Sequence, residues 1–204
     1  EDDGYVGWLP TNALVAPGPP PTHKVAVLRT LVFPGRTIKL PPVDALALGA
    51  QVHVLRHEGD FAVSPGGYLP ARHVVPLDAP ETDYVAVAER FLGAPYLWGG
   101  KTSLGIDCSG LVQIALKAAG VSCPRDSDLQ ENALGAAVDP GPGCGHLRRG
   151  DLMFWDGHVA IVRDAATILH ANAHHMAVAF EQLSEALARI AAAGCELRCV
   201  RRLG

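Results

Sequence analysis

Hydrophobic and polar positions follow two different patterns along the chain, and the change lies near residue 80. Before it, the runs KVAVLRTLVF (24–33) and QVHVLRHEGDFAV (51–63) are short, rich in β-branched residues and bounded by Gly and Pro. Such runs are typical of short strands, so the pattern predicts a small all-β barrel over 23–77. Proline-rich stretches at 16–23 and 76–83 predict a linker on either side of it.

After residue 80 the pattern is first helical and then strand-like. TDYVAVAERFLG (82–93) has apolar residues at helical spacing before a glycine, which predicts a helix with a glycine stop. CSGLVQIALKAAG (108–120) and RDSDLQENALG (125–135) predict two more helices. After Gly150 we expect three strands, a helix and a last strand, with the sequences DLMFW, HVAIVRD, TILHA, EQLSEALARIAAAG and ELRCVRR. Helices followed by antiparallel strands predict an α+β domain over 82–204.

A weak internal repeat links the start of the chain to the predicted barrel. GWLPTNALV (7–15) resembles GYLPARHVV (67–75), and each has the pattern of a closing strand and turn. The repeat predicts that residues 1–16 are the remnant of a first β unit and that this chain is the C-terminal part of a longer protein. A chance match over nine residues is the alternative.

Composition excludes several functional classes. The 17 Lys and Arg residues against 21 Asp and Glu give a net charge of −4, and no basic block predicts a nucleic-acid site. No apolar run approaches the roughly 18 residues of a membrane span, and the acidic start lacks the order of a secretion signal. Five cysteines without a C-x-x-C pair argue against a disulfide framework and predict at least one free thiol.

Cys108 begins a predicted helix, a position that suits a nucleophile. Backbone N–H groups and the positive end of the helix dipole favour a thiolate there, which predicts a pKa below the ordinary value of about 8.5. The N–H of Cys108 can face an oxyanion, and Gly110 is expected to leave room for a substrate. A buried apolar cysteine without chemistry is the alternative.

Two histidines are candidates for the base that a nucleophilic thiol needs. His158 opens the predicted strand HVAIV and His170 ends the next strand, TILH. Adjacent antiparallel strands would bring the two rings together, so that one takes the thiol proton and the other orients it. Two unrelated strand-end histidines are the alternative, and His174 and His175 are expected in an exposed loop.

The segments PYLWGG, DCSGLV, PRDSDLQ, RRGDLMFW, HVAIV and ILHA, in this order and spacing, resemble the NlpC/p60 cysteine peptidases of bacterial cell-wall metabolism. The resemblance covers about residues 82–203 and implies a papain-like catalytic domain. It implies that Cys108 is the nucleophile, His158 the base and His170 the residue that orients the base. Tyr96 is implied to line the oxyanion site.

The same resemblance implies the substrate contacts. Asp107, Ser109, Asp126 and Ser127 are expected to hold the D-glutamyl part of the substrate, and Arg125 either pairs with a carboxylate of the substrate or forms a structural ion pair. No metal or other cofactor is expected to be needed. The β region resembles a bacterial SH3-like (SH3b) barrel, as found ahead of the catalytic domain in one subfamily.

The implied function is hydrolysis of the bond between γ-D-glutamate and a diamino acid, meso-diaminopimelate or L-Lys, in murein peptides. An amidase or acyltransferase with the same Cys–His machinery is one alternative, and a non-catalytic wall-binding module is another. The expected partner is the murein peptide, with cytoplasmic recycling favoured over a periplasmic or secreted location. The oligomeric state stays open.

Overall fold

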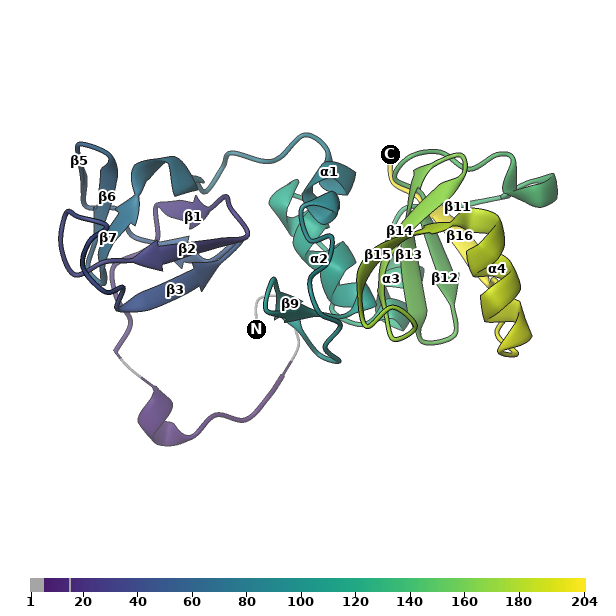
Figure 1. Ribbon diagram of the computed structural model, residues 1–204, viewed down its shortest axis with the longest axis horizontal. Helices are drawn as coiled ribbons and strands as arrows, with labels where there is room; N and C mark the ends of the chain where they lie inside the picture. The colour runs from purple at the N-terminus through teal and green to yellow at the C-terminus, as the bar shows by residue number, and fades with distance from the viewer. Residues whose placement is uncertain (1–5, 15) are drawn as a thin grey trace. The chain divides into compact units, whose positions relative to one another are not determined.

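The computed structural model describes residues 6–14 and 16–204, and the chain divides into two compact units, Glu1–Pro80 and Glu81–Gly204 (Figure 1). Each unit has its own buried apolar residues, as expected for a chain whose hydrophobic pattern changes at this point. Among the described residues, no helix combines the length and the apolar character that crossing a membrane requires.

The N-terminal unit is built from short antiparallel strands. Its strands form sheets in the order β4-β1-β8, β2-β3 and β5-β6-β7. The bounds are β1 His23–Val25, β2 Arg29–Val32, β3 Asp44–Ala47, β4 Gln51–Val52, β5 Arg56–Glu58, β6 Phe61–Ser64, β7 Gly67–Pro70 and β8 Val74–Pro76. Their inward side chains form one small core of Val25, Val32, Ala62, Leu69 and Val74. The predicted all-β character is confirmed, whereas the assignment to the SH3-like barrels stays a prediction.

The two halves of the sequence repeat share a local conformation. In each, a proline with extended backbone precedes a single 3₁₀ turn, Thr11–Ala13 after Pro10 and Ala71–His73 after Pro70. The second copy continues from β7 into β8, but the described part of the first copy, residues 7–14, contains no strand. Residues 1–5 and 15 of the predicted remnant lie outside the described residues, and the remnant stays a prediction.

A six-stranded antiparallel sheet forms the centre of the C-terminal unit, in the order β11-β16-β12-β13-β14-β15. Its strands are β11 Ala136–Val138, β12 Leu152–Trp155, β13 His158–Asp164, β14 Thr167–Asn172, β15 Ala177–Gln182 and β16 Cys199–Arg202. β12 and the centre of β13, residues 159–162, are continuous apolar runs that are buried throughout. Such runs indicate a sheet that is covered on both faces.

Helices cover the two faces of this sheet (Figure 1). Helix α4 (Leu183–Ala192) buries Leu183, Ala186 and Ile190 in one cluster with Ala160 and Val162 of β13. Helix α2 (Cys108–Ala118) packs against β13 and β14 and against α1 (Tyr84–Glu89). A short hairpin, β9 (Lys101–Thr102) and β10 (Gly105–Ile106), precedes α2, and α3 (Ser127–Ala133) follows it. The predicted α+β order is confirmed.

One boundary predicted from the sequence is wrong. Glu181 and Gln182 were expected to open the last helix, but they end β15, a strand that the sequence pattern did not predict. The reason is that β15 pairs along its whole length with β14, from Ala177 opposite Asn172 to Gln182 opposite Thr167. Ladder hydrogen bonds to a neighbouring strand outweigh the helical preference of two residues. The β15 assignment brings Glu181 onto the sheet, next to His170.

Candidate active site

Cys108 is the first residue of α2, and Asp107 caps the helix. The Asp107 carboxylate accepts a hydrogen bond of 2.7 Å from the Gly110 N–H, which satisfies one of the unpaired N–H groups of the first turn. A Cβ on Gly110 would lie 2.4 Å from the Gly100 carbonyl oxygen. The space that the sequence suggested for a substrate is therefore filled by the chain itself. Glycine is required there for the loop to approach the helix.

A buried ion pair fixes the residues around Cys108. Arg125 donates to both oxygens of Asp107, at 3.0 and 2.6 Å, and to the Ser109 hydroxyl at 2.8 Å. The Gly99 N–H donates to the same carboxylate at 2.7 Å. Both side chains are largely buried, so each charge is compensated by the other. Of the two roles considered for Arg125, the ion pair within the protein is the one the structure contains.

The Cys108 thiol is 7% exposed and lies among backbone N–H groups. The N–H groups of Val159, Ser109 and Cys108 favour its thiolate, and Val159 directly follows His158. Burial has the larger effect and raises the pKa of the Cys108 thiol above its ordinary value. The lowered pKa expected from the helix terminus is therefore wrong, because removal of the sulfur from water outweighs the dipole. Burial therefore favours the neutral thiol over the thiolate in the resting site.

His158, His170 and Glu181 form a hydrogen-bonded line across three strands. Nε2 of His158 lies 2.9 Å from Nδ1 of His170, and Nε2 of His170 lies 2.9 Å from Oε2 of Glu181. The sheet register explains the line, because Ile161 faces Leu169 and Ile168 faces Glu181. Each pair of side chains is thus diagonal across adjacent strands, a separation that long side chains can bridge. The predicted meeting of His158 and His170 is confirmed.

The carboxylate sets the positions of the protons along this line. Arg189 of α4 donates to both oxygens of Glu181, at 2.8 and 2.7 Å, and its charge lowers the pKa of that carboxyl. An ionised carboxylate only accepts hydrogen bonds, so the proton of His170 is on Nε2. Burial lowers the pKa of both histidines and keeps them neutral, hence Nδ1 of His170 accepts from Nε2–H of His158. Nδ1 of His158 is left as the basic nitrogen.

Glu181 and Arg189 were missed by the sequence analysis. Both fall within the run EQLSEALARIAAAG, where a helical pattern makes a glutamate and an arginine ordinary surface residues. Alternation along VAFEQ, with Glu181 two residues beyond Ala179, was the available signal for a strand. The side chain of Glu181 is 8% exposed, which for a charged group indicates specific partners.

The other predicted site residues differ in their exposure. Tyr96 is partly buried, and its pKa is raised by burial and by the charges of Cys108 and Asp107. Ser109 is buried against Arg125, whereas Asp126 is exposed and Ser127 partly exposed at the start of α3. Asp126 occupies the N-cap position of α3 but makes no cap hydrogen bond with its side chain.

A buried thiol at a helix N-terminus, near a histidine whose ring is oriented by a second group, is typical of thiol-dependent acyl-transfer enzymes, the class that includes the cysteine peptidases. Comparison with known proteins assigns the family. Residues 93–192 match the model of the NlpC/P60 family. The C-terminal unit therefore contains an NlpC/P60 domain.

Two curated relatives are named gamma-D-glutamyl-L-lysine dipeptidyl-peptidase. The one from Bacillus subtilis is 30% identical over 160 residues, which are 74% of this chain and 52% of the relative. The one from Bacillus cereus is 37% identical over 90 residues, 44% of this chain and 25% of the relative. The chain thus spans about half or less of the length of these relatives.

A solved structure supports the fold over most of the chain. An NlpC/P60 family protein from Bacillus cereus superposes with a TM-score of 0.71 at 23% sequence identity. The match covers 89% of this chain and 63% of that protein. At this level of identity the likeness concerns the fold alone.

The Arg125→Met substitution tests the buried ion pair. It leaves the Asp107 carboxylate buried without its partner, so we expect the C-terminal unit to lose about 3–5 kcal/mol of unfolding free energy. Urea unfolding followed by circular dichroism measures this loss. Arg148→Met, at an exposed position of the same unit, is the control and should change little. An Arg125→Met protein as stable as the parent would contradict the structural role of the pair.

Alkylation of Cys108 by iodoacetamide tests the state of the resting thiol. A neutral, buried thiol should react slowly at pH 6, and its rate should rise with pH with a midpoint above the ordinary value of about 8.5. Peptide mass spectrometry follows Cys108 site by site, with the more exposed Cys195 as internal reference. Fast, pH-independent alkylation of Cys108 from pH 5 to 7 would instead indicate a preformed thiolate.

Proposed function

We propose that this protein is a cysteine endopeptidase that hydrolyses the bond between γ-D-glutamate and meso-diaminopimelate or L-Lys in murein peptides. The observation that carries the proposal is the hydrogen bond between His158 and His170. Nδ1 of His158 is the basic nitrogen of this pair, and the N–H of the next residue, Val159, faces the Cys108 thiol. The names of the two Bacillus relatives support the choice of bond.

In the proposed reaction, Sγ of Cys108 attacks the γ-glutamyl carbonyl carbon while Nδ1 of His158 takes the thiol proton. Proton transfer accompanies attack, because both groups are neutral at rest. The N–H of Cys108 and the hydroxyl of Tyr96 stabilise the oxyanion. The imidazolium of His158 then protonates the leaving amine, the C–N bond breaks, and water hydrolyses the remaining thioester. His170 holds the ring of His158 in this orientation throughout.

We propose that the side chains of Asp126 and Ser127 contact the substrate directly, since Asp126 is exposed and Ser127 partly exposed at the start of α3. Asp107 and Ser109 act differently in this scheme. Their polar atoms already bind Arg125, so they support the nucleophile from within the protein. We further propose that the N-terminal unit is an SH3-like barrel and that the substrates are short murein peptides recycled in the cytoplasm.

Incubation with L-Ala-γ-D-Glu-meso-diaminopimelate and with its L-Lys counterpart tests the reaction. The parent protein should release L-Ala-D-Glu and the free diamino acid, as detected by mass spectrometry. The Cys108→Ala variant should bind but release nothing, because no thioester can form. Transfer of the acyl group to an added amine would indicate an acyltransferase. Undiminished turnover by Cys108→Ala would overturn the proposed nucleophile.

The Glu181→Gln variant tests the proton arrangement behind His158. An amide can donate as well as accept, so the orientation of both imidazoles is no longer imposed. Since a hydrogen bond to a charged group is worth about 1.5–3 kcal/mol, we expect kcat to fall roughly 10- to 100-fold with little change in KM. Glu185→Gln, an exposed carboxylate on α4, is the matched control. Equal kcat values for the parent and Glu181→Gln would remove Glu181 from the mechanism.

A further inference from the structure

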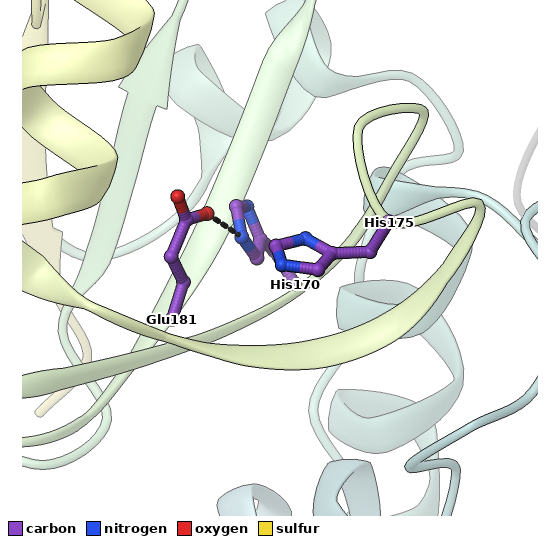
Figure 2. A group of neighbouring side chains, drawn as sticks. All are labelled: His170, His175 and Glu181. Atoms are coloured by element: carbon purple, nitrogen blue, oxygen red, sulfur yellow. Dashed lines mark hydrogen bonds and ion pairs between the residues drawn. The ribbon is translucent and has the colours of Figure 1, made fainter.

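Three side chains suited to binding a metal ion gather behind the proposed catalytic histidines. Figure 2 shows Glu181 on β15, His170 on β14 and His175 in the turn between these strands, with the His175 ring beside that of His170. One ligand atom from each lies within 4.8 Å of the other two. Two imidazoles and a carboxylate are a common ligand set for zinc.

Each of these side chains is also held by a second residue. Nδ1 of His175 lies 3.0 Å from the Asn172 side-chain oxygen, which leaves Nε2 for a ligand. His170 is held through its Nδ1 by His158, and Glu181 is held by Arg189. Metal ligands in proteins are typically oriented by such outer partners, which fix the ring that presents the free nitrogen. An accidental cluster of surface histidines would not need such outer partners.

A cavity lies beside two members of this group, His175 and Glu181. It has a volume of about 300 Å³ and is lined, among others, by His174, His175, Glu181 and Glu185. Its two carboxylates attract a cation, partly offset by Arg189. Zinc–ligand bonds of about 2.0–2.1 Å require ligand atoms about 3.3 Å apart. The exposed His175 must therefore move by up to about 1.5 Å, whereas buried His170 can stay in place.

We propose that a divalent zinc ion binds His170, His175 and Glu181 from this cavity, with water as fourth ligand, and inhibits the enzyme. This inference rests on the proposed function for its inhibitory effect, but not for binding. The ion is a regulator here and takes no part in the reaction. With an arginine on Glu181, we expect binding in the micromolar range rather than that of a structural zinc site.

Inhibition follows from the positions of the protons. Zinc on Nε2 of His170 displaces the proton that Glu181 accepts at present. Nδ1 of His170 then takes the proton from Nε2 of His158, and His158 regains one from solvent at Nδ1. Both rings remain neutral and no net proton is lost, but Nδ1 of His158 now carries a proton. It can no longer accept the proton of the Cys108 thiol.

Zinc binding is measured first, in the Cys108→Ala background, so that the nucleophile cannot bind the ion. Isothermal titration of zinc into Cys108→Ala should show one site that is lost in Cys108→Ala/His175→Ala and kept in Cys108→Ala/His174→Ala. His174 is the matched control, because it is the neighbouring histidine of the same turn. Cobalt as a spectroscopic probe should show tetrahedral coordination only in proteins that keep His175. Identical titrations for all three proteins would overturn the site.

Inhibition is measured next, with Cys108 intact. His175→Ala should keep the parent's kcat without zinc and need at least tenfold more zinc for half inhibition. If His175→Ala is inhibited as strongly as the parent, zinc acts directly on Cys108 and His158, and the proposal fails. If the parent shows no peptidase activity at all, the titration still decides the site while the proposed function falls. Nitrogen NMR of the histidines should show His170 protonated at Nδ1 only when zinc is present.

Discussion

The buried carboxylate of Asp107 is the constraint on which the catalytic unit depends. A charge in this position is tolerated because Arg125 binds both of its oxygens and two glycine N–H groups donate to it. These partners come from the loop before β9, from the first turn of α2 and from the segment before α3. One side chain thereby ties three segments together around Cys108. Cys108, the proposed nucleophile, is thus positioned by its neighbour in the sequence.

A second chain of contacts connects helix α4 to His158. Arg189 of α4 holds Glu181, Glu181 holds His170, and His170 holds His158. His158 donates to His170 and His170 donates to Glu181, so a change at the Glu181 carboxylate alters the position of the protons on both rings. The cavity beside Glu181 lies at this end of the line. The proton on His158 is thus coupled to a surface on the far side of Glu181.

Much of this arrangement could be predicted from local patterns. Helical spacing located the helix that Cys108 begins, and short apolar runs located the strands of His158 and His170. Glu181 was assigned to the helix instead of the strand, because β15 is followed at once by the amphipathic helix α4 and no turn residue marks the boundary. The role of Gly110 was misjudged because the neighbour that fills its space, Gly100, is close only in the fold.

The sequence by itself determined the two-part organisation, the α+β order and the meeting of two strand histidines, since these depend on periodicity and on contacts between neighbouring elements. Only the tertiary structure decided the pKa of Cys108, the partner of Arg125 and the carboxylate behind His170. Each of these depends on burial and on long-range register, which bring together groups that no local pattern relates. A shift of two residues in the pairing of β15 would have placed another side chain beside His170.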